Sequence, residues 1–157
     1  GLGLTASWLL DDRKMMNTAA LVTQSIFLTQ AFAEGTKRLT GRLRPNDSED
    51  DSGRWREGGA SFFSGHASGT WGAATVVAER YPDGITPYLA YGWATAVSLS
   101  RINDDGHWAS DVITGGIVGY MIGKSIVKLN PLDDEGGVRV MPLAEPGVVG
   151  LAFYKQF

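Results

Sequence analysis

Apolar residues recur at steps of three and four along most of the chain, which is the spacing of one face of an α-helix. The first such stretch covers residues 14–41 and ends at a glycine, a residue that often follows a helix. Three further stretches cover residues 64–81, 86–102 and 108–129. The pattern therefore predicts an all-α fold, a compact helical bundle.

The segments outside these helices have other patterns. Residues 42–63 form a long loop with an acidic run at residues 47–51. In the tail, residues 138–141 and 148–157 resemble two short strands around a Pro-Gly pair, which predicts a β-hairpin. We expect a single domain over residues 1–157, with its helical core at about 14–130 and an extended tail at about 131–157.

Composition limits the classes of function. The chain has 157 residues, 43% of them hydrophobic and 20% charged, which is ordinary for one globular domain. Its net charge of −3 does not suit a nucleic-acid partner, because surfaces that bind nucleic acid are basic. The chain has no cysteine, so disulfides, zinc–thiolate sites and thiol nucleophiles are excluded.

A membrane-spanning helix needs about 20 mainly apolar residues. The charge-free stretches at residues 15–33 and 84–100 are interrupted by polar residues or proline. We therefore expect a soluble domain, with peripheral association at a membrane surface as the alternative. No targeting segment is visible and the chain starts at Gly1, so we expect that an N-terminal portion has been removed.

Three glycines lie at four-residue steps in the last predicted helix: Gly115, Gly119 and Gly123. Each glycine destabilises a helix interior by about 1 kcal/mol relative to alanine. The close approach of a neighbouring helix would compensate for that effect. We interpret these glycines as a packing surface without a chemical role.

The two histidines are the candidates for chemistry. His107 precedes Asp111 by four residues, so on a helix the carboxylate can hold one imidazole nitrogen and leave the other free as a nucleophile or base. His66 follows Ser64 and Gly65, where a serine cap and free backbone N–H groups favour anion binding. The alternatives are a His–Asp pair that only satisfies its own hydrogen bonds, and an ordinary helix cap.

Four cations are clustered around the end of the first predicted helix: Lys37, Arg38, Arg42 and Arg44. The simplest interpretation is that cations are favourable at a helix C-terminus. Arg44-Pro45 also begins a rigid turn, however, and a guanidinium in a fixed position can bind phosphate through two hydrogen bonds.

Three motifs occur in order: Lys37-x6-Arg44-Pro45, Ser64-Gly65-His66 and Ser100-Arg101-x5-His107-x3-Asp111. They resemble the signature of the type 2 phosphatidic acid phosphatase (PAP2) superfamily, which includes lipid phosphatases, bacterial acid phosphatases and vanadium haloperoxidases. The resemblance covers residues 37–111, about half of the chain, and it implies an α-helical bundle. The family usually has a proline before the second motif, where this chain has Phe63.

The resemblance implies a role for each matched residue. His107 would be the nucleophile that forms a phosphohistidine, and Asp111 would hold and polarise it. His66 would protonate the leaving oxygen and then activate water. The remaining matched residues would bind the phosphoryl oxygens: Lys37, Arg44, Ser64, Gly65 and Arg101.

Three side-chain cations would stabilise a phosphate of charge about −1.5 to −2 without a metal, so we expect no metal and no cofactor. The acidic run lacks the spacing of an EF-hand and is expected to be a solvated loop that shapes the entrance. Three tryptophans near the motifs are expected in the core or the pocket wall, with an apolar lip for a lipid chain as the alternative: Trp55, Trp71 and Trp108.

Together these features predict a metal-independent phosphatase for phosphate monoesters or diphosphates, lipid phosphates among them. Its expected location is the periplasm or a membrane. The alternatives are a vanadium-dependent haloperoxidase, in which His107 would ligate vanadium, and a non-catalytic helical domain that binds anions.

Overall fold

A computed structural model describes residues 2–49, 51–130, 138–145 and 148–155. It contains the helices α1 (Leu2–Thr40), α2 (Gly65–Arg80), α3 (Thr86–Asn103) and α4 (Ala109–Leu129). A short 3-10 helix, η1 (Pro45–Asp47), lies in the long loop after α1. The prediction of an all-α fold is confirmed.

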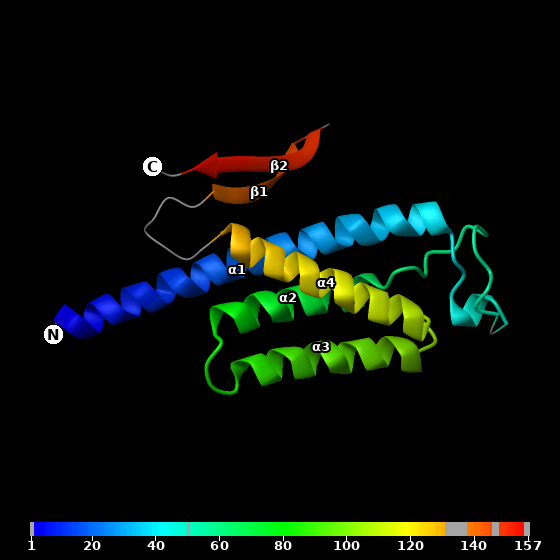
Figure 1. The fold of residues 1–157 in the computed structure, drawn as a ribbon, viewed down its shortest axis with the longest axis horizontal. Coiled ribbons are helices and arrows are strands. Elements are labelled where there is room, and N and C mark those ends of the chain that lie inside the picture. Colours follow the sequence, from blue (N-terminus) through cyan, green and yellow to red (C-terminus); the bar gives the residue numbers. More distant parts are fainter. Residues whose placement is uncertain (1, 50, 131–137, 146–147, 156–157) are drawn as a thin grey trace.

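The helices pack around α2, which contacts α1, α3 and α4 (Figure 1). The chain runs along α1, back along α2, forward along α3 and back along α4. As a result, the end of α1, the long loop, the start of α2, the end of α3 and the start of α4 all gather at one end of the bundle. This topology brings together the three motif segments, which are far apart in the sequence.

A close helix contact joins α2 to α4 through the glycines predicted to be a packing surface. A Cβ atom at Gly119 would lie 2.2 Å from the carbonyl oxygen of Ser68, and one at Gly115 would lie 2.6 Å from that of Ser64. At Gly123 a Cβ atom would lie 2.6 Å from the carbonyl oxygen of Gly72. The prediction of a close helix approach is confirmed, and it fixes the start of α2 against the start of α4.

Local caps determine where these two helices begin. The Ser64 side chain accepts a hydrogen bond from the Ala67 N–H, which makes Ser64 the N-cap of α2. Asp111, the third residue of α4, accepts the backbone N–H of the cap residue Trp108 at 3.2 Å. Two of the motifs therefore also act as helix starts.

The first helix is longer than predicted, because it begins at Leu2 and not at residue 14. Residues 2–13 contain no proline that would end a helix. In the tail, β1 (Val138–Glu145) pairs antiparallel with β2 (Val148–Lys155), Val138 opposite Lys155. The predicted Pro-Gly turn at 146–147 and the last two residues lie outside the described residues.

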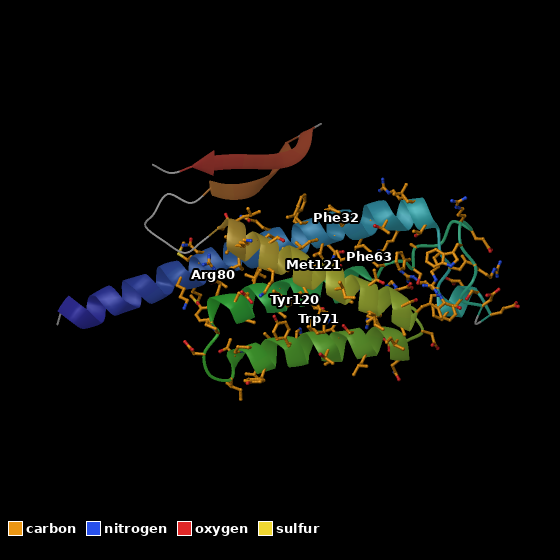
Figure 2. The ribbon with its side chains drawn as sticks, viewed as in Figure 1. Phe32, Phe63, Trp71, Arg80, Tyr120 and Met121 are labelled. Atoms are coloured by element: carbon orange, nitrogen blue, oxygen red, sulfur yellow. The ribbon has the colours of Figure 1, made fainter. Side chains whose placement is uncertain are left out.

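The outside of the bundle carries many large apolar side chains. On α4 these include Ile113 and Ile117, which are 61% and 57% exposed, and Met121 (Figure 2). Phe32 on α1 and Trp93 on α3 are also more than half exposed. Within the described part of the chain, α4 is the one helix whose length and composition would allow it to cross a membrane. This helix has no long charge-free stretch, because Asp111, Lys124 and Lys128 interrupt its apolar sequence, and so it was not predicted to span a membrane.

Candidate active site

The predicted site residues come from five segments at the loop end of the bundle. Lys37 lies in the last turn of α1, Arg44 precedes η1, and Arg101 lies in the last turn of α3. The others are at helix starts, on α2 or at α4: Ser64, Gly65, His66, His107 and Asp111.

His107 is held in one orientation by the loop before α2. Its side chain is 5% exposed, and Nδ1 lies 2.8 Å from the backbone carbonyl oxygen of Ser61. A carbonyl oxygen only accepts hydrogen bonds, so Nδ1 carries the ring proton. The lone pair of a neutral His107 is therefore on Nε2, which is the nitrogen available for chemistry.

Asp111 is fully buried beside His107. Its Oδ2 lies 3.9 Å from Nδ1 of His107, which is an ion-pair distance and longer than a hydrogen bond. The Ser61 hydroxyl donates to the same oxygen, and Arg42 forms an ion pair with Oδ1. Asp111 therefore acts on the imidazole mainly through its charge and through Ser61.

The charge of Asp111 is stabilised by these partners. Burial alone would raise the pKa of the carboxyl group. Its polar neighbours outweigh burial and lower the pKa below the usual value; they are His107, Ser61, Arg42 and the backbone N–H of Trp108. The carboxylate is therefore ionised across the neutral pH range.

His66 is exposed on the first turn of α2. Burial lowers the pKa of its imidazole, and four nearby cationic or imidazole groups lower it further: Arg101, His107, Lys37 and Arg44. Each of these groups is a predicted site residue, so the three motifs lie within electrostatic reach of one another. This mutual repulsion between cations is what an anion in their midst would relieve.

The start of α2 is fixed from two directions. The Ser64 N–H donates to the carbonyl oxygen of Asp111 at 3.0 Å, and the Gly65 carbonyl oxygen accepts a hydrogen bond from Nε2 of Gln30 at 2.8 Å. A Cβ atom at Gly65 would lie 2.8 Å from the Gln30 side-chain oxygen, which explains why a glycine fits here. The backbone N–H groups of this turn are therefore held in place.

The three predicted phosphate-binding cations differ in their surroundings. Lys37 and Arg44 are half-buried. Arg101 donates from Nη2 to Asp104 Oδ2 at 2.8 Å, and its side chain is 32% exposed. A phosphate would compete with Asp104 for the Arg101 guanidinium.

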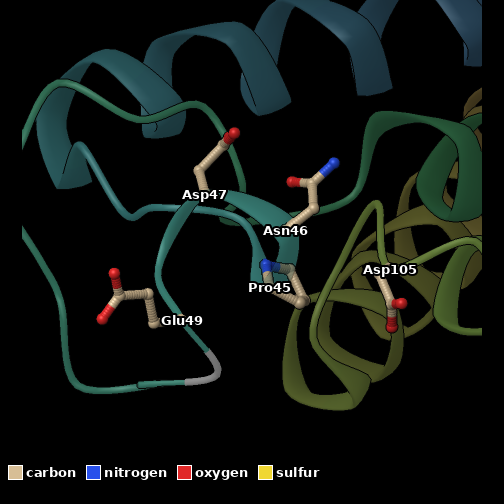
Figure 3. A pocket seen from close by; sticks show the side chains of 5 residues that line it. All are labelled: Pro45, Asn46, Asp47, Glu49 and Asp105. Atoms are coloured by element: carbon tan, nitrogen blue, oxygen red, sulfur yellow. The ribbon is translucent and has the colours of Figure 1, made fainter.

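The acidic loop borders this end of the bundle. A cavity of about 480 Å³ is lined by Pro45, Asn46, Asp47, Glu49 and Asp105 (Figure 3). Asp47 and Glu49 are exposed, as expected of a solvated loop. Within the described residues, no group of three or more potential ligands of the His, Asp or Glu type could hold a metal ion.

Two residues of the site had not been assigned a role from the sequence. Arg42 was part of the basic cluster, but the pattern gave no sign that it pairs with Asp111. Ser61 contributes a hydroxyl and a backbone carbonyl, and the carbonyl has no signature in the sequence. Of the three tryptophans, Trp55 and Trp108 pack against Arg42, while Trp71 donates to Ser98.

A model of a known protein family matches most of the chain. The model of the PAP2 superfamily matches residues 18–133, which contain all three motifs. The chain belongs to the PAP2 superfamily. The resemblance inferred from the motifs is thereby confirmed.

One relative gives a narrower comparison for this PAP2 chain. This chain is 30% identical over 124 residues to the lipid A 1-phosphatase of Porphyromonas gingivalis. The match covers 78% of the PAP2 chain and 24% of the relative's length. No solved structure matches the chain.

Proposed function

We propose that this PAP2 chain is a phosphatase that hydrolyses phosphate monoesters or diphosphates through a phosphohistidine intermediate. The observation that carries the proposal is the orientation of His107. Its Nδ1 proton is held by the Ser61 carbonyl, so the Nε2 lone pair is available for attack on phosphorus. The shared electrostatic field of His66, Lys37 and Arg101 supports an anion site beside it.

The first step forms a covalent intermediate. Nε2 of His107 attacks phosphorus, the P–N bond forms and the P–O bond to the leaving group breaks. His66 in its protonated form donates a proton to the leaving oxygen. The imidazole becomes positively charged when it is phosphorylated, and the Asp111 carboxylate 3.9 Å from Nδ1 stabilises that charge.

The second step releases phosphate. His66, now neutral, removes a proton from a water molecule that attacks phosphorus. The P–N bond breaks, and the electron pair returns to Nε2 of His107. Both histidines are then in the states in which they began, so the reaction needs no other reactant than water.

The remaining motif residues hold the phosphoryl oxygens. Lys37, Arg44 and Arg101 neutralise charge, with Arg101 exchanging its Asp104 partner for the phosphate. The Ser64 hydroxyl accepts the Ala67 N–H and keeps its own proton to donate. The Gly65 N–H at the start of α2 completes the site.

The proposed substrate class is lipid-linked phosphates, and two observations support it. The relative is a phosphatase that acts on a lipid, lipid A. The exposed apolar side chains of α3 and α4, such as Leu99 and Ile113, are suited to contact with lipid. We therefore propose that the enzyme acts at a membrane and that it is located in the periplasm.

The test is hydrolysis of p-nitrophenyl phosphate and of phosphatidic acid in mixed micelles, both with EDTA present. We expect activity that survives chelation and that falls at least about 10⁴-fold in His107→Ala, the scale seen when a covalent nucleophile is removed. His66→Ala should slow phosphatidic acid more than p-nitrophenyl phosphate, because the better leaving group needs less protonation.

Three outcomes would contradict the proposal. Halide oxidation that appears only with added vanadate would indicate a haloperoxidase. Binding of phosphate without turnover would indicate a non-catalytic anion-binding domain. Full activity in a folded His107→Ala variant would remove the phosphohistidine step.

A further inference from the structure

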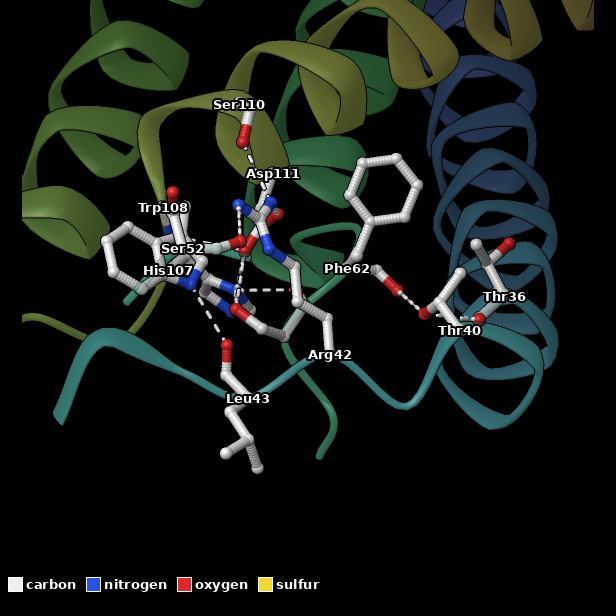
Figure 4. Close-up of polar contacts among 11 residues, drawn as sticks. Thr36, Thr40, Arg42, Leu43, Ser52, Phe62, His107, Trp108, Ser110 and Asp111 are labelled. Atoms are coloured by element: carbon white, nitrogen blue, oxygen red, sulfur yellow. Dashed lines mark hydrogen bonds and ion pairs between the residues drawn. The ribbon is translucent and has the colours of Figure 1, made fainter. Parts of the chain in front are cut away.

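The guanidinium of Arg42 binds Asp111, the carboxylate beside the proposed nucleophile His107. Its Nη1 pairs with Asp111 and donates to Ser110 Oγ at 2.8 Å, while Nη2 donates to the Ser52 carbonyl oxygen at 3.0 Å (Figure 4). The Arg42 side chain is 6% exposed and that of Asp111 is 0% exposed. Solvent therefore screens this ion pair very little.

Two indole rings hold the guanidinium in place. Its central carbon lies 4.5 Å from the centroid of the Trp55 ring and 5.4 Å from that of Trp108. The Trp108 ring is itself anchored, because Nε1 donates to the Leu43 carbonyl oxygen at 2.9 Å. Cation–π contacts on a desolvated arginine add to the ion pair, so Arg42 is positioned before any substrate binds.

A chain of contacts connects this arginine to the nucleophile. One carboxylate oxygen of Asp111 pairs with Arg42, and the other accepts the Ser61 hydroxyl. The carbonyl of the same Ser61 accepts the Nδ1–H of His107 at 2.8 Å. Ser61 is fully buried, so a displacement of the carboxylate is transmitted to the imidazole.

We propose that Arg42 is a positioning residue: by pairing with Asp111 it keeps His107 in the tautomer whose Nε2 is free to attack phosphorus. The inference rests on the proposed phosphatase function. Without the guanidinium, a fully buried carboxylate has lost its counter-charge and must take up a proton or move. Protonation removes the negative charge that favours a phosphorylated imidazole, and movement of the carboxylate breaks its hydrogen bond with Ser61.

The direct test is the tautomer of His107 in an Arg42→Met variant, which removes the charge and keeps an apolar stem. The chain has two histidines, so ¹⁵N NMR of the imidazoles gives two sets of signals, assigned with a His66→Gln variant. We expect His107 to be protonated at Nδ1 in the wild-type protein and to become a mixture of tautomers in Arg42→Met.

The kinetic test separates positioning from folding. We expect kcat to fall by about 10- to 100-fold in Arg42→Met, with little change in KM, because the phosphate-binding cations remain. The acidic limb of the kcat–pH profile should move to higher pH, because Asp111 then faces His107 without Arg42 and is more easily protonated. A merely structural loss would lower kcat equally at all pH values.

Arg54→Met is the matched control. Arg54 lies in the same loop, and its ion pair with Glu57 is at the surface, so we expect no change in tautomer or kcat. Arg42→Lys keeps the charge but not the fork of two Nη groups, and kcat should be intermediate. If Arg42→Met does not fold, Arg42→Lys takes its place as the test variant. A kcat equal to that of the wild type in Arg42→Lys would then overturn the inference.

The result is separable from the proposed function. A wild-type protein without phosphatase activity would refute that function, while the NMR measurement would still report on Arg42. An unchanged His107 signal in folded Arg42→Met, or a kcat within about twofold of wild type, overturns the role of Arg42.

Discussion

At the residue scale, the protonation of His66 links the electrostatics of the site to its proposed chemistry. Burial and the positive charges around it lower the pKa of His66 below its ordinary value. A general acid must be protonated before it can act. Because the pKa of His66 is lowered, its imidazole is protonated only at a correspondingly lower pH. The proposed reaction is therefore favoured on the acidic side of neutrality in the free enzyme.

We predict that kcat/KM for an alkyl phosphate falls as pH rises through the pKa of His66. Arg44 is one of the cations that lower the pKa of His66. The Arg44→Gln variant should therefore have a higher His66 pKa, and the basic limb of its kcat/KM–pH profile should move to higher pH. Titration of His66 by NMR measures the shift without relying on activity, and added phosphate should raise the pKa as well. Arg38→Gln is the control, because Arg38 is exposed and pairs with Glu34. A shift of equal size in both variants would contradict a shared site.

The residues of the site differ in how far the sequence could predict them. His107 and Asp111 were recognisable because their chemistry depends on side-chain type and four-residue spacing. Ser61 holds the imidazole through a backbone carbonyl, which every residue type carries, so no pattern could reveal it. Arg42 was one of four clustered cations, and only the fold determines which of them faces Asp111.

At the element scale, the contact between α2 and α4 sets the geometry of the site. The start of α2 carries the turn proposed to bind the phosphate, and the start of α4 carries Asp111. Their backbones approach so closely that a Cβ atom at Gly119 would lie 2.2 Å from the Ser68 carbonyl oxygen. Backbone atoms cannot yield as a flexible side chain can, so the two helices would have to separate.

We predict that Gly119→Ala destabilises the protein by about 1–3 kcal/mol, the usual effect of overpacking, despite alanine's higher helix propensity. Gly92 in α3 is the matched control, because a Cβ atom there would have nothing within 4 Å. Gly92→Ala should raise stability by up to about 1 kcal/mol. Thermal unfolding measured by circular dichroism compares the two, and equal effects would show that the α2–α4 contact is not tight.

The helix pattern predicted all four helices and most of their ends. Apart from the start of α1, every helix end was placed to within one residue. Glycine after α1 and the serine cap of α2 are examples of the signals that mark such ends. The predicted start of α1 was twelve residues too late, because the apolar three- and four-residue spacing was recognised only from residue 14 onward. The antiparallel order of the helices could not be read from periodicity, which does not report which helix packs on which.

At the scale of the whole molecule, the core is small and the exterior is apolar. The buried apolar cluster of Leu21, Val76 and Ile126 lies where α1, α2 and α4 meet. Outside it, α3 and α4 expose large apolar side chains, including Trp93 and Ile117. A monomer in water rarely exposes so much apolar surface, whereas contact with lipid would cover it. The same α4 that begins at the proposed active site has a length and composition that would allow it to cross a membrane.

We predict that the protein floats with phospholipid vesicles and that Ile113→Lys/Ile117→Lys does not. Both side chains are exposed on α4, so the substitutions should leave folding unchanged, while each lost apolar contact weakens lipid binding by about 1.5–3 kcal/mol. Ile113→Leu/Ile117→Leu keeps the surface apolar and should float like wild type. Hydrolysis of p-nitrophenyl phosphate should survive in both variants, and that of vesicle-bound phosphatidic acid only in the leucine variant. Flotation of the folded lysine variant would show that this face of α4 does not contact lipid.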